Sequence, residues 1–187
     1  MEVYHGTGSD FISFNKNKVP KNYSSLLFGW GFYFTESERR AEFYASQALV
    51  PRGKSERYVL ACSLPVREDK FLDWNKSIQE QSSSVIESMK YIANTKTAIG
   101  NEMKDIIGYD NFYDMTGENV FKMLKPSQSD QDFYKNLKKV SSEFVKSGIY
   151  GIIFNDISDV RDVDPELKNI AFFDVDRVKI LTRKNAF

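Results

Sequence analysis

The residues with the clearest chemical potential lie in the first fifty positions of the chain. Residues 4–7 read Tyr-His-Gly-Thr and contain the single histidine, while residues 29–34 alternate glycine with aromatic side chains. Tyr33, in this second segment, stands eleven residues before Tyr44. An imidazole, glycines without a Cβ and two tyrosine rings can together hydrogen-bond and stack on a flat, polar molecule. The block therefore predicts a binding site for such a ligand.

Two short strands and one helix must position these side chains. The sequence predicts a strand over residues 2–5 and an aromatic-rich strand over residues 31–35. Ser37 is a suitable helix N-cap, and Ala41, Tyr44, Ala45 and Ala48 then share one helical face. Because a strand followed by a helix can fold back on itself, we expect Tyr33 and Tyr44 to reach one cleft.

The remaining pattern predicts an α+β fold. We expect strands at 58–64, 151–154, 170–175 and 178–182, and helices at 77–93, 98–107, 116–125 and 130–147. The last helix is expected to be capped by Ser129 or Asp130 and to end at Gly148. Residues 10–27 and the acidic segment 155–168 are expected to be loops. Strands and helices do not alternate regularly, which favours α+β over α/β, and 187 residues fit one domain over residues 1–187.

Composition narrows the classes of function. Twenty-six basic and twenty-six acidic residues balance, which argues against a protein that holds nucleic acid mainly through its net charge. Lys135, Lys138, Lys139 and Lys146 lie on the polar side of the expected helix 130–147, and such a run is either a solvated face or a contact for phosphates or an acidic partner.

The cysteine and histidine content and the hydropathy pattern give three further expectations. Cys62, the only cysteine, lies in an apolar strand-like run and is expected to be a buried structural thiol. One histidine and one cysteine offer no zinc site, so no metal is expected. The sequence begins with neither a basic nor an apolar leader pattern and contains no span-length apolar stretch, so we expect no membrane contact and a cytoplasmic location, in the producing cell or in a target cell.

The block of residues 4–44 resembles the ADP-ribosyltransferase superfamily, in its diphtheria-toxin and poly(ADP-ribose)-polymerase branch. That branch has a His-Gly-Ser/Thr motif, a Gly-x-Gly-x-Tyr-Phe strand and a second tyrosine eleven residues after the first. The chain is similar in particular to the ADP-ribosyltransferase domains of phage and mobile-element polyvalent proteins, which share its Leu-Asp-Trp-Asn-Lys segment at 72–76. The likeness covers residues 3–181. It implies split antiparallel β-sheets with flanking helices, and NAD as substrate.

The resemblance implies a role for each residue of the block. Two tyrosine faces can sandwich the cationic nicotinamide ring, and a glycine backbone can hydrogen-bond its carboxamide. A neutral histidine can bind a ribose hydroxyl, the threonine adds a hydroxyl nearby, and the glycines at 29 and 31 relieve crowding where the cofactor crosses the strand. The expected NAD-binding residues are His5, Gly6, Thr7, Gly31, Tyr33 and Tyr44.

One position departs from the polymerase pattern. The family glutamate that binds the ribose and activates the acceptor aligns with Asn169, and an amide donates and accepts hydrogen bonds without acting as a general base. Elongation to poly(ADP-ribose) is therefore not expected. A replacement base could come from Glu36, Glu38 or Glu166, with Glu36 the first candidate. The expected catalytic residues are His5, Tyr44, Asn169 and Glu36.

These residues predict a mono-ADP-ribosyltransferase that modifies a macromolecule, either a protein or a nucleic acid, in the manner of a toxin, an effector or a phage-conflict protein. An antitoxin or immunity protein is an expected partner. Two alternatives stay open on the sequence. The first is an NAD glycohydrolase, in which water is the acceptor, and the second is a non-catalytic module that binds NAD or another nucleotide.

Overall fold

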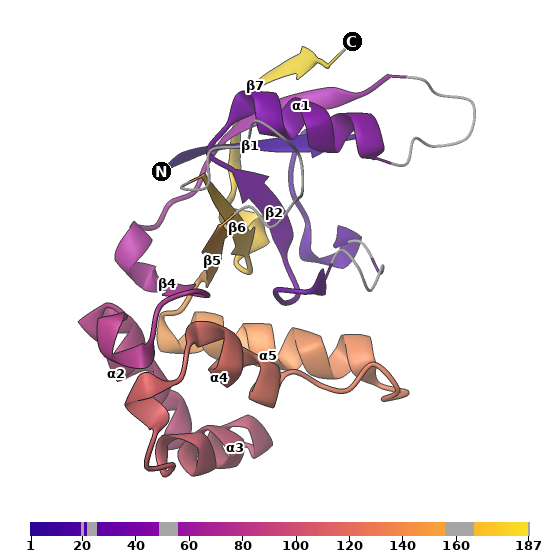
Figure 1. Cartoon of the computed structure of the whole chain (residues 1–187). Helices are drawn as coiled ribbons and strands as arrows, with labels where there is room; N and C mark the ends of the chain where they lie inside the picture. Colours follow the sequence, from indigo (N-terminus) through magenta and orange to yellow (C-terminus); the bar gives the residue numbers. More distant parts are fainter. Residues whose placement is uncertain (20, 22–25, 49–55, 156–166, 187) are drawn as a thin grey trace.

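The computed structural model describes residues 1–19, 21, 26–48, 56–155 and 167–186, which form seven strands and five α-helices (Figure 1). The strands are β1 (Glu2–Thr7), β2 (Phe32–Thr35), β3 (Tyr58–Ser63), β4 (Phe71–Asp73), β5 (Gly151–Asn155), β6 (Lys168–Phe172) and β7 (Lys179–Asn185). The helices are α1 (Glu38–Gln47), α2 (Ser83–Ala93), α3 (Ala98–Ile107), α4 (Gly117–Leu124) and α5 (Phe133–Ser147).

The described strands form one sheet in the order β4-β5-β6-β2-β1-β3-β7. Neighbouring strands run antiparallel except β4 and β5, which run parallel. The mixed strand-and-helix class is thus confirmed. The split antiparallel sheets that the resemblance implies are not confirmed: the described strands form one sheet in which β1 and β2 still pair, and β5 returns after the helical segment to run parallel to β4.

The pairing between β1 and β2 is the weakest point of this sheet. These strands share one register pair, Tyr4 with Thr35, whereas β1 pairs with β3 over its whole length and β2 pairs with β6 over its whole length. The sheet therefore consists of two well-paired groups of strands, β7-β3-β1 and β2-β6-β5-β4, that separate beyond Tyr4.

Helix α1 covers the β7-β3-β1 group of strands, where it packs on β1 and β3. Ser37 accepts a hydrogen bond from the Arg40 backbone N–H and caps the helix as the sequence predicts. Ala41 and Ala45 are fully buried, packed with Val59. Small side chains on this face let the helix lie directly on β1. A Cβ on Gly6 would lie 2.0 Å from the Ala41 carbonyl oxygen, so only glycine fits there.

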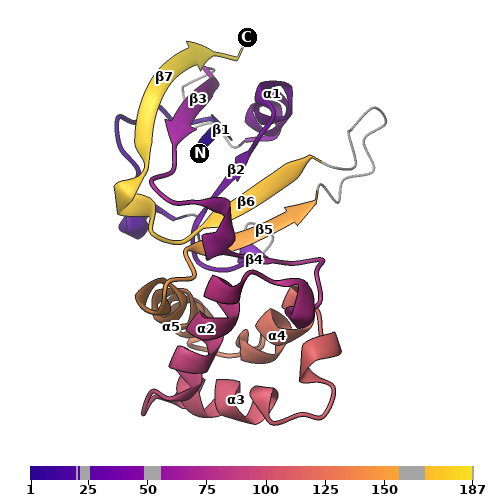
Figure 2. The same cartoon turned by 90° about the vertical axis from the view of Figure 1, so that its left-hand side faces the viewer.

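The other four helices gather at the β4–β5 end of the sheet (Figures 1 and 2). One apolar cluster joins them to the strands; its fully buried members include Leu72, Met89, Phe121, Leu137, Ile152 and Phe172. Helix α3 has the predicted bounds, and Gly148, at φ 103°, ends α5 as predicted. Cys62 is fully buried, and burial raises the pKa of its thiol to about 12, which confirms the structural role expected for it.

Two helix starts differ from the prediction. The expected helix 77–93 is divided into a 3-10 turn, Ile78–Glu80, and α2, because Ser82 accepts from the Val85 N–H and starts a new helix. Helix α5 begins at Phe133 rather than at residue 130. The Asp130 carboxylate is bonded instead to the Asp132 N–H and the Asn136 amide, a local turn before the helix.

Gly31 is required by packing within the chain. A Cβ at this position would lie 2.2 Å from the Phe172 carbonyl oxygen, where the approach to β2 meets the end of β6. The resemblance implies that this glycine makes room for a cofactor crossing the strand, but the crowding that the structure describes comes from β6.

We expect Gly31→Ala to destabilise the fold by about 2 kcal/mol or more, since the new methyl group must displace backbone atoms. Gly108→Ala is the matched control: its Cβ would lie 3.3 Å from the nearest atom, the Asp105 carbonyl oxygen at a helix end. The control should change stability by less than about 1 kcal/mol. Urea unfolding of both variants measures the difference, and equal stabilities would contradict this packing role.

Candidate functional site

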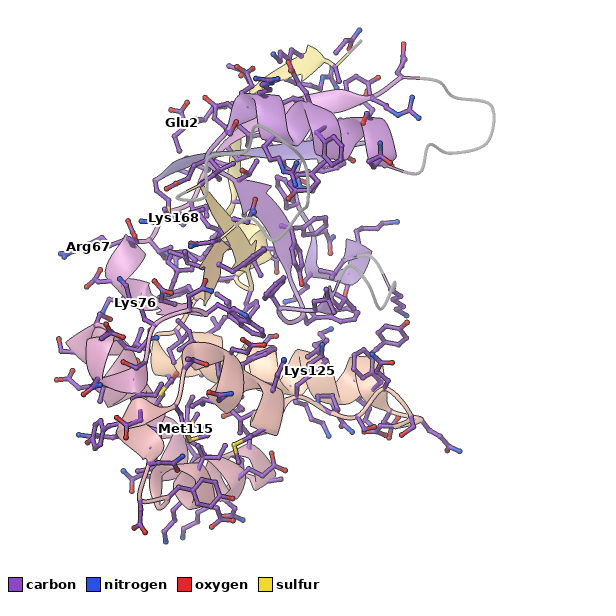
Figure 3. The ribbon with its side chains drawn as sticks, viewed as in Figure 1. Glu2, Arg67, Lys76, Met115, Lys125 and Lys168 are labelled. Carbon is purple, nitrogen blue, oxygen red and sulfur yellow. The ribbon has the colours of Figure 1, made fainter. Side chains whose placement is uncertain are left out.

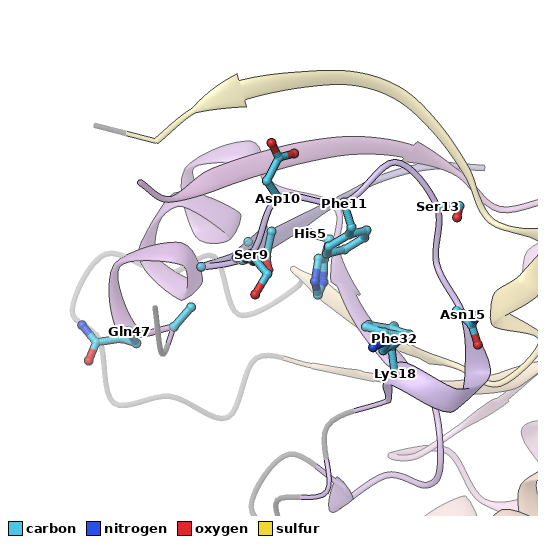
Figure 4. Close-up of a pocket in the computed structure, with 13 residues that line it drawn as sticks. His5, Ser9, Asp10, Phe11, Ser13, Asn15, Lys18, Phe32 and Gln47 are labelled. Atoms are coloured by element: carbon cyan, nitrogen blue, oxygen red, sulfur yellow. Dashed lines mark hydrogen bonds between the residues drawn. The ribbon is translucent and has the colours of Figure 1, made fainter. Parts of the chain in front are cut away.

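A cleft of about 650 Å³ opens where β1 runs past its last pair with β2 (Figure 4). Its volume lies within the range of roughly 300–1,000 Å³ that is typical of small-molecule sites. Figure 4 shows His5 and Phe11 near its centre, with Ser9 and Gln47 toward one end and Asn15 and Lys18 toward the other. The lining consists of His5, Gly6, Thr7, Gly8, Ser9, Asp10, Phe11, Ser13, Asn15, Lys18, Phe32, Gln47 and Ala48.

His5 bridges the two groups of strands at this cleft. Its Nδ1 lies 2.7 Å from the Tyr33 carbonyl oxygen. Because a carbonyl oxygen only accepts hydrogen bonds, Nδ1 must carry a proton. Burial lowers the pKa of the His5 imidazole, and this effect outweighs the opposing hydrogen bond to Tyr33. The ring is therefore neutral near pH 7, and Nε2 is left as a hydrogen-bond acceptor.

Aromatic side chains hold the His5 ring in place. Phe14 and Phe32 pack edge-on against it, with ring centroids 5.3 and 5.8 Å away, and Phe11 and Phe34 contact it at tilted angles. These rings supply the apolar surroundings that disfavour an imidazolium ion. They also leave few alternative positions for the ring, so the orientation of Nε2 is fixed before a ligand binds.

Polar groups follow His5 around the cleft. The Thr7 hydroxyl accepts from the Ser9 N–H, and Asp10 is paired with Arg183 of β7. Lys18 also lines the cleft, and among the described residues it forms no ion pair. A lysine ammonium without a carboxylate partner suits a phosphate group, which makes the cleft compatible with a nucleotide.

The strand register places Tyr33 and Asn169 on one face of the sheet. Thr35 pairs with Asn169, and cross-strand partners point to the same face, as do alternate residues of one strand. Tyr4, the partner of Thr35, packs against α1, so this face is the one that α1 covers. Tyr33, Asn169 and α1, which carries Tyr44, thus lie on the same side, whereas His5 extends to the opposite side from its neighbour Tyr4.

Asn169 is the most informative of the predicted residues. It is 2% exposed, and in the described part of the chain neither its amide nitrogen nor its amide oxygen has a hydrogen-bond partner. A buried polar group without a partner costs about 1–3 kcal/mol of stability. Since buried polar groups in folded proteins are almost always bonded, a ligand hydroxyl that both donates and accepts would satisfy this side chain.

The two predicted stacking tyrosines contact the chain itself. The Tyr33 ring packs against Phe28 and Phe154, and its hydroxyl accepts from the Phe28 N–H. Burial raises the pKa of this hydroxyl, so it stays protonated. Tyr44 is 37% exposed, and the Arg40 guanidinium lies 4.8 Å from its ring centroid. In this structure the Arg40 guanidinium thus makes a cation–π contact with the Tyr44 ring.

The carboxylates considered as replacement bases do not gather at Asn169. The Glu36 N–H donates to the Lys168 carbonyl, so Glu36 continues the β2–β6 register and its side chain faces away from Asn169. A hydrogen bond to Glu68 and, to a smaller extent, the charge of Glu36 raise the pKa of the Lys168 ammonium. Lys168 lies on the same side of the molecule as Arg67 and Lys76 (Figure 3). Glu38 pairs with Lys184, and Glu166 lies outside the described residues.

Sequence reasoning missed the loop that forms much of the cleft. Residues 8–18 contribute seven of its described lining residues, whereas the sequence predicts no more than a loop for residues 10–27. The position of this loop could have predicted its part in the cleft. A polar loop that directly follows residues 4–7 must pass over the end of β1.

Comparison with protein-family models, with curated proteins and with solved structures gives no match to this chain. Among the described residues no group of three His, Cys, Asp or Glu side chains could hold a metal ion, and none of the described helices is long and apolar enough to cross a bilayer. The motif of residues 4–44 and its place in the fold are therefore the features that bear on function.

The protonation of His5 gives a test of this site. Its pKa is lowered from 6.5, so below that pH the unfolded chain binds the proton more readily than the folded one. Its contribution to stability is therefore present above about pH 6.5 and is lost as the pH falls below it. His5→Asn keeps an N–H donor near Tyr33 without titrating, and its stability should fall less between pH 7 and pH 5 than that of the wild type.

Nuclear magnetic resonance of the ring reports the same property directly, because the chain contains one histidine. We expect a single imidazole signal that is neutral at pH 7, protonated on Nδ1, and that titrates below pH 6.5. An imidazole that is charged at pH 7, or protonated on Nε2, would contradict the geometry.

Proposed function

We propose that this chain is an NAD-dependent mono-ADP-ribosyltransferase that acts on a macromolecular acceptor. The observation that carries the proposal is the buried amide of Asn169, for which the described residues provide no hydrogen-bond partner. It stands at the position where the resembling family binds the ribose, on the same sheet face as Tyr33 and in a chain whose first strand carries the His-Gly-Thr motif. A biological role as a toxin, an effector or a phage-conflict protein, with an antitoxin or immunity partner, is part of this proposal.

NAD supplies an N-glycosidic bond that breaks with departure of neutral nicotinamide, which takes the bonding electrons, while the acceptor atom bonds to the ribose C1′ and loses a proton. For this reaction His5 offers Nε2 to a ribose hydroxyl from a ring already fixed by Tyr33 and the surrounding phenylalanines. Lys18 offers charge to the pyrophosphate. Asn169 offers a donor and an acceptor to a second hydroxyl.

An amide at position 169 favours single transfer to a nucleophile that needs little activation. Asn169 can orient the ribose but cannot remove the acceptor proton. Glu36, the first candidate for a replacement base, faces away from Asn169 and is not among the described residues that line the His5 cleft. A nucleobase nitrogen or an already nucleophilic side chain would make a general base unnecessary, whereas water, the weakest nucleophile of the three, would need one. This reasoning favours transfer to a macromolecule over NAD hydrolysis.

Incubation with adenine-labelled NAD and whole-cell lysate, separated into protein and nucleic-acid fractions, tests the proposal. Label in either fraction together with release of nicotinamide supports it. Nicotinamide release without labelling of any macromolecule identifies a glycohydrolase. NAD that binds but stays intact identifies a binding module. Either of the last two results contradicts the transferase proposal.

Tyr44 tests the binding of nicotinamide. Tyr44→Ala should weaken NAD binding by about 1 kcal/mol or more, because the cation–π contact with the oxidised ring is lost. Tyr44→Phe keeps the aromatic face and should bind nearly as well as the wild type. Calorimetric titration measures both, and equal losses in the two variants would assign the effect to the hydroxyl instead.

Substitutions of Asn169 distinguish an effect on activity from an effect on stability. Asn169→Leu removes a buried amide that has no partner in the part of the chain that the structure describes, so the free protein should be as stable as the wild type or more stable. Its rate of nicotinamide release should fall by roughly tenfold to a thousandfold, the cost of one well-placed transition-state contact. Asn169→Glu introduces a carboxylate and should increase NAD hydrolysis. An Asn169→Leu variant that is fully active would show that this side chain does not touch the substrate.

A further inference from the structure

A second hollow on the described surface, of about 740 Å³, gathers positive charge beside α5. We call it the lysine groove; its cations are Lys16, Lys21, Lys135, Lys138, Lys139 and Lys146. Glu143 is the one carboxylate among the described residues that line it. Basic and acidic residues balance over the whole chain, so this groove concentrates a charge that the chain as a whole lacks.

Half of these lysines are available to an anion. Lys16, Lys135 and Lys146 pair with Asp176, Asp132 and Glu143. These are exposed ion pairs, which are weak and can exchange with a competing anion. In the regions that the structure describes, Lys21, Lys138 and Lys139 form no ion pair.

Two aromatic side chains lie among the lysines. Trp30 and Tyr134 both line the groove, with ring centroids 6.3 Å apart at an angle of 69°. Tyr134 is 36% exposed and offers a surface on which a base can stack. Trp30 is held in place by its backbone N–H, which donates to Ser141, and its indole N–H has no acceptor among the described residues.

The groove adjoins the His5 cleft. Asn15 and Lys18 line the cleft, whereas Lys16 and Asn17 line the groove, and all four belong to one 3-10 turn with its cap. The two hollows therefore lie on either side of the same short segment. A chain-like ligand seated in the groove can reach the mouth of the cleft.

We propose that the lysine groove binds single-stranded nucleic acid. A row of cations fits the phosphodiester backbone, and an exposed aromatic ring fits an unpaired base, a combination typical of single-strand binding. An acidic protein would use the lysines but not the ring. That the bound strand is also the acceptor of ADP-ribose rests on the proposed function, but the binding does not.

Binding is therefore measured without NAD, by fluorescence anisotropy with short single-stranded DNA and RNA oligonucleotides at several salt concentrations. We expect the affinity to fall steeply with salt, with a log–log slope of about −0.7 for each phosphate neutralised. The double variant Lys138→Gln/Lys139→Gln should weaken binding about tenfold or more and reduce the slope by about 1.4. Tyr134→Ala should weaken binding about tenfold.

Matched controls come from other helices. Lys90 on α2 and Lys104 on α3 are exposed, as is Tyr91, which is 60% exposed. Lys90→Gln/Lys104→Gln and Tyr91→Ala remove the same groups elsewhere and should leave binding unchanged. All variants change surface positions, and circular dichroism verifies their folding.

The possible outcomes separate the two proposals. Absence of oligonucleotide binding, equal losses in the control variants, or tighter binding of polyglutamate than of either oligonucleotide would overturn the groove proposal, even if NAD-dependent labelling of protein is found. Oligonucleotide binding that depends on Lys138, Lys139 and Tyr134 supports the groove proposal, even if no NAD-dependent labelling is found. The absence of labelling would contradict only the proposed enzymatic function.

Discussion

The hydrogen bond from the His5 imidazole to the Tyr33 carbonyl oxygen is the interaction on which the candidate site depends. β1 and β2 share a single register pair, Tyr4 with Thr35, and His5 connects the two strands just where that pairing ends. The bond keeps the separating strands at a fixed distance, so the cleft exists without a ligand. It also fixes the proton on Nδ1 and, with burial, keeps the ring neutral. One contact thus joins the two strands beside the cleft and sets the hydrogen-bonding character of the His5 ring.

Close packing around this opening explains residues that also look like ligand contacts. Gly6 is required where α1 lies on β1, and Gly31 is required where β2 approaches β6. A glycine at such a position can allow close packing within the chain and also leave its backbone accessible to a ligand. Both follow from the absence of a Cβ atom. Asn169 differs from these glycines. In the described part of the chain its amide has no hydrogen-bond partner, and the proposed function assigns it a hydroxyl of the ligand.

Local signals in the sequence were sufficient for most elements. The cap at Ser37, the bounds of α3 and the end of α5 at Gly148 each depend on a few neighbouring residues, and all were predicted. Long-range pairing was not accessible in the same way. No local pattern indicates that β4 runs parallel to β5, that Phe172 crowds Gly31, or that residues 8–18 form the wall of the His5 cleft. Those features depend on which strands pair with each other. The spacing of motifs therefore predicts which residues form a site better than it predicts the shape of that site.

The central proposal is that one NAD molecule binds both to His5, in the cleft beside β1, and to Asn169, whose side chain lies on the opposite face of the sheet. Titration of isotope-labelled protein with NAD, followed by the side-chain signals of the one histidine and of Asn169, tests it most directly. The account predicts that the His5 Nε2 signal and the Asn169 amide signal both shift, with one common saturation curve, while the exposed amides of α3 do not. Shifts at only one of the two side chains, or at neither, would contradict it.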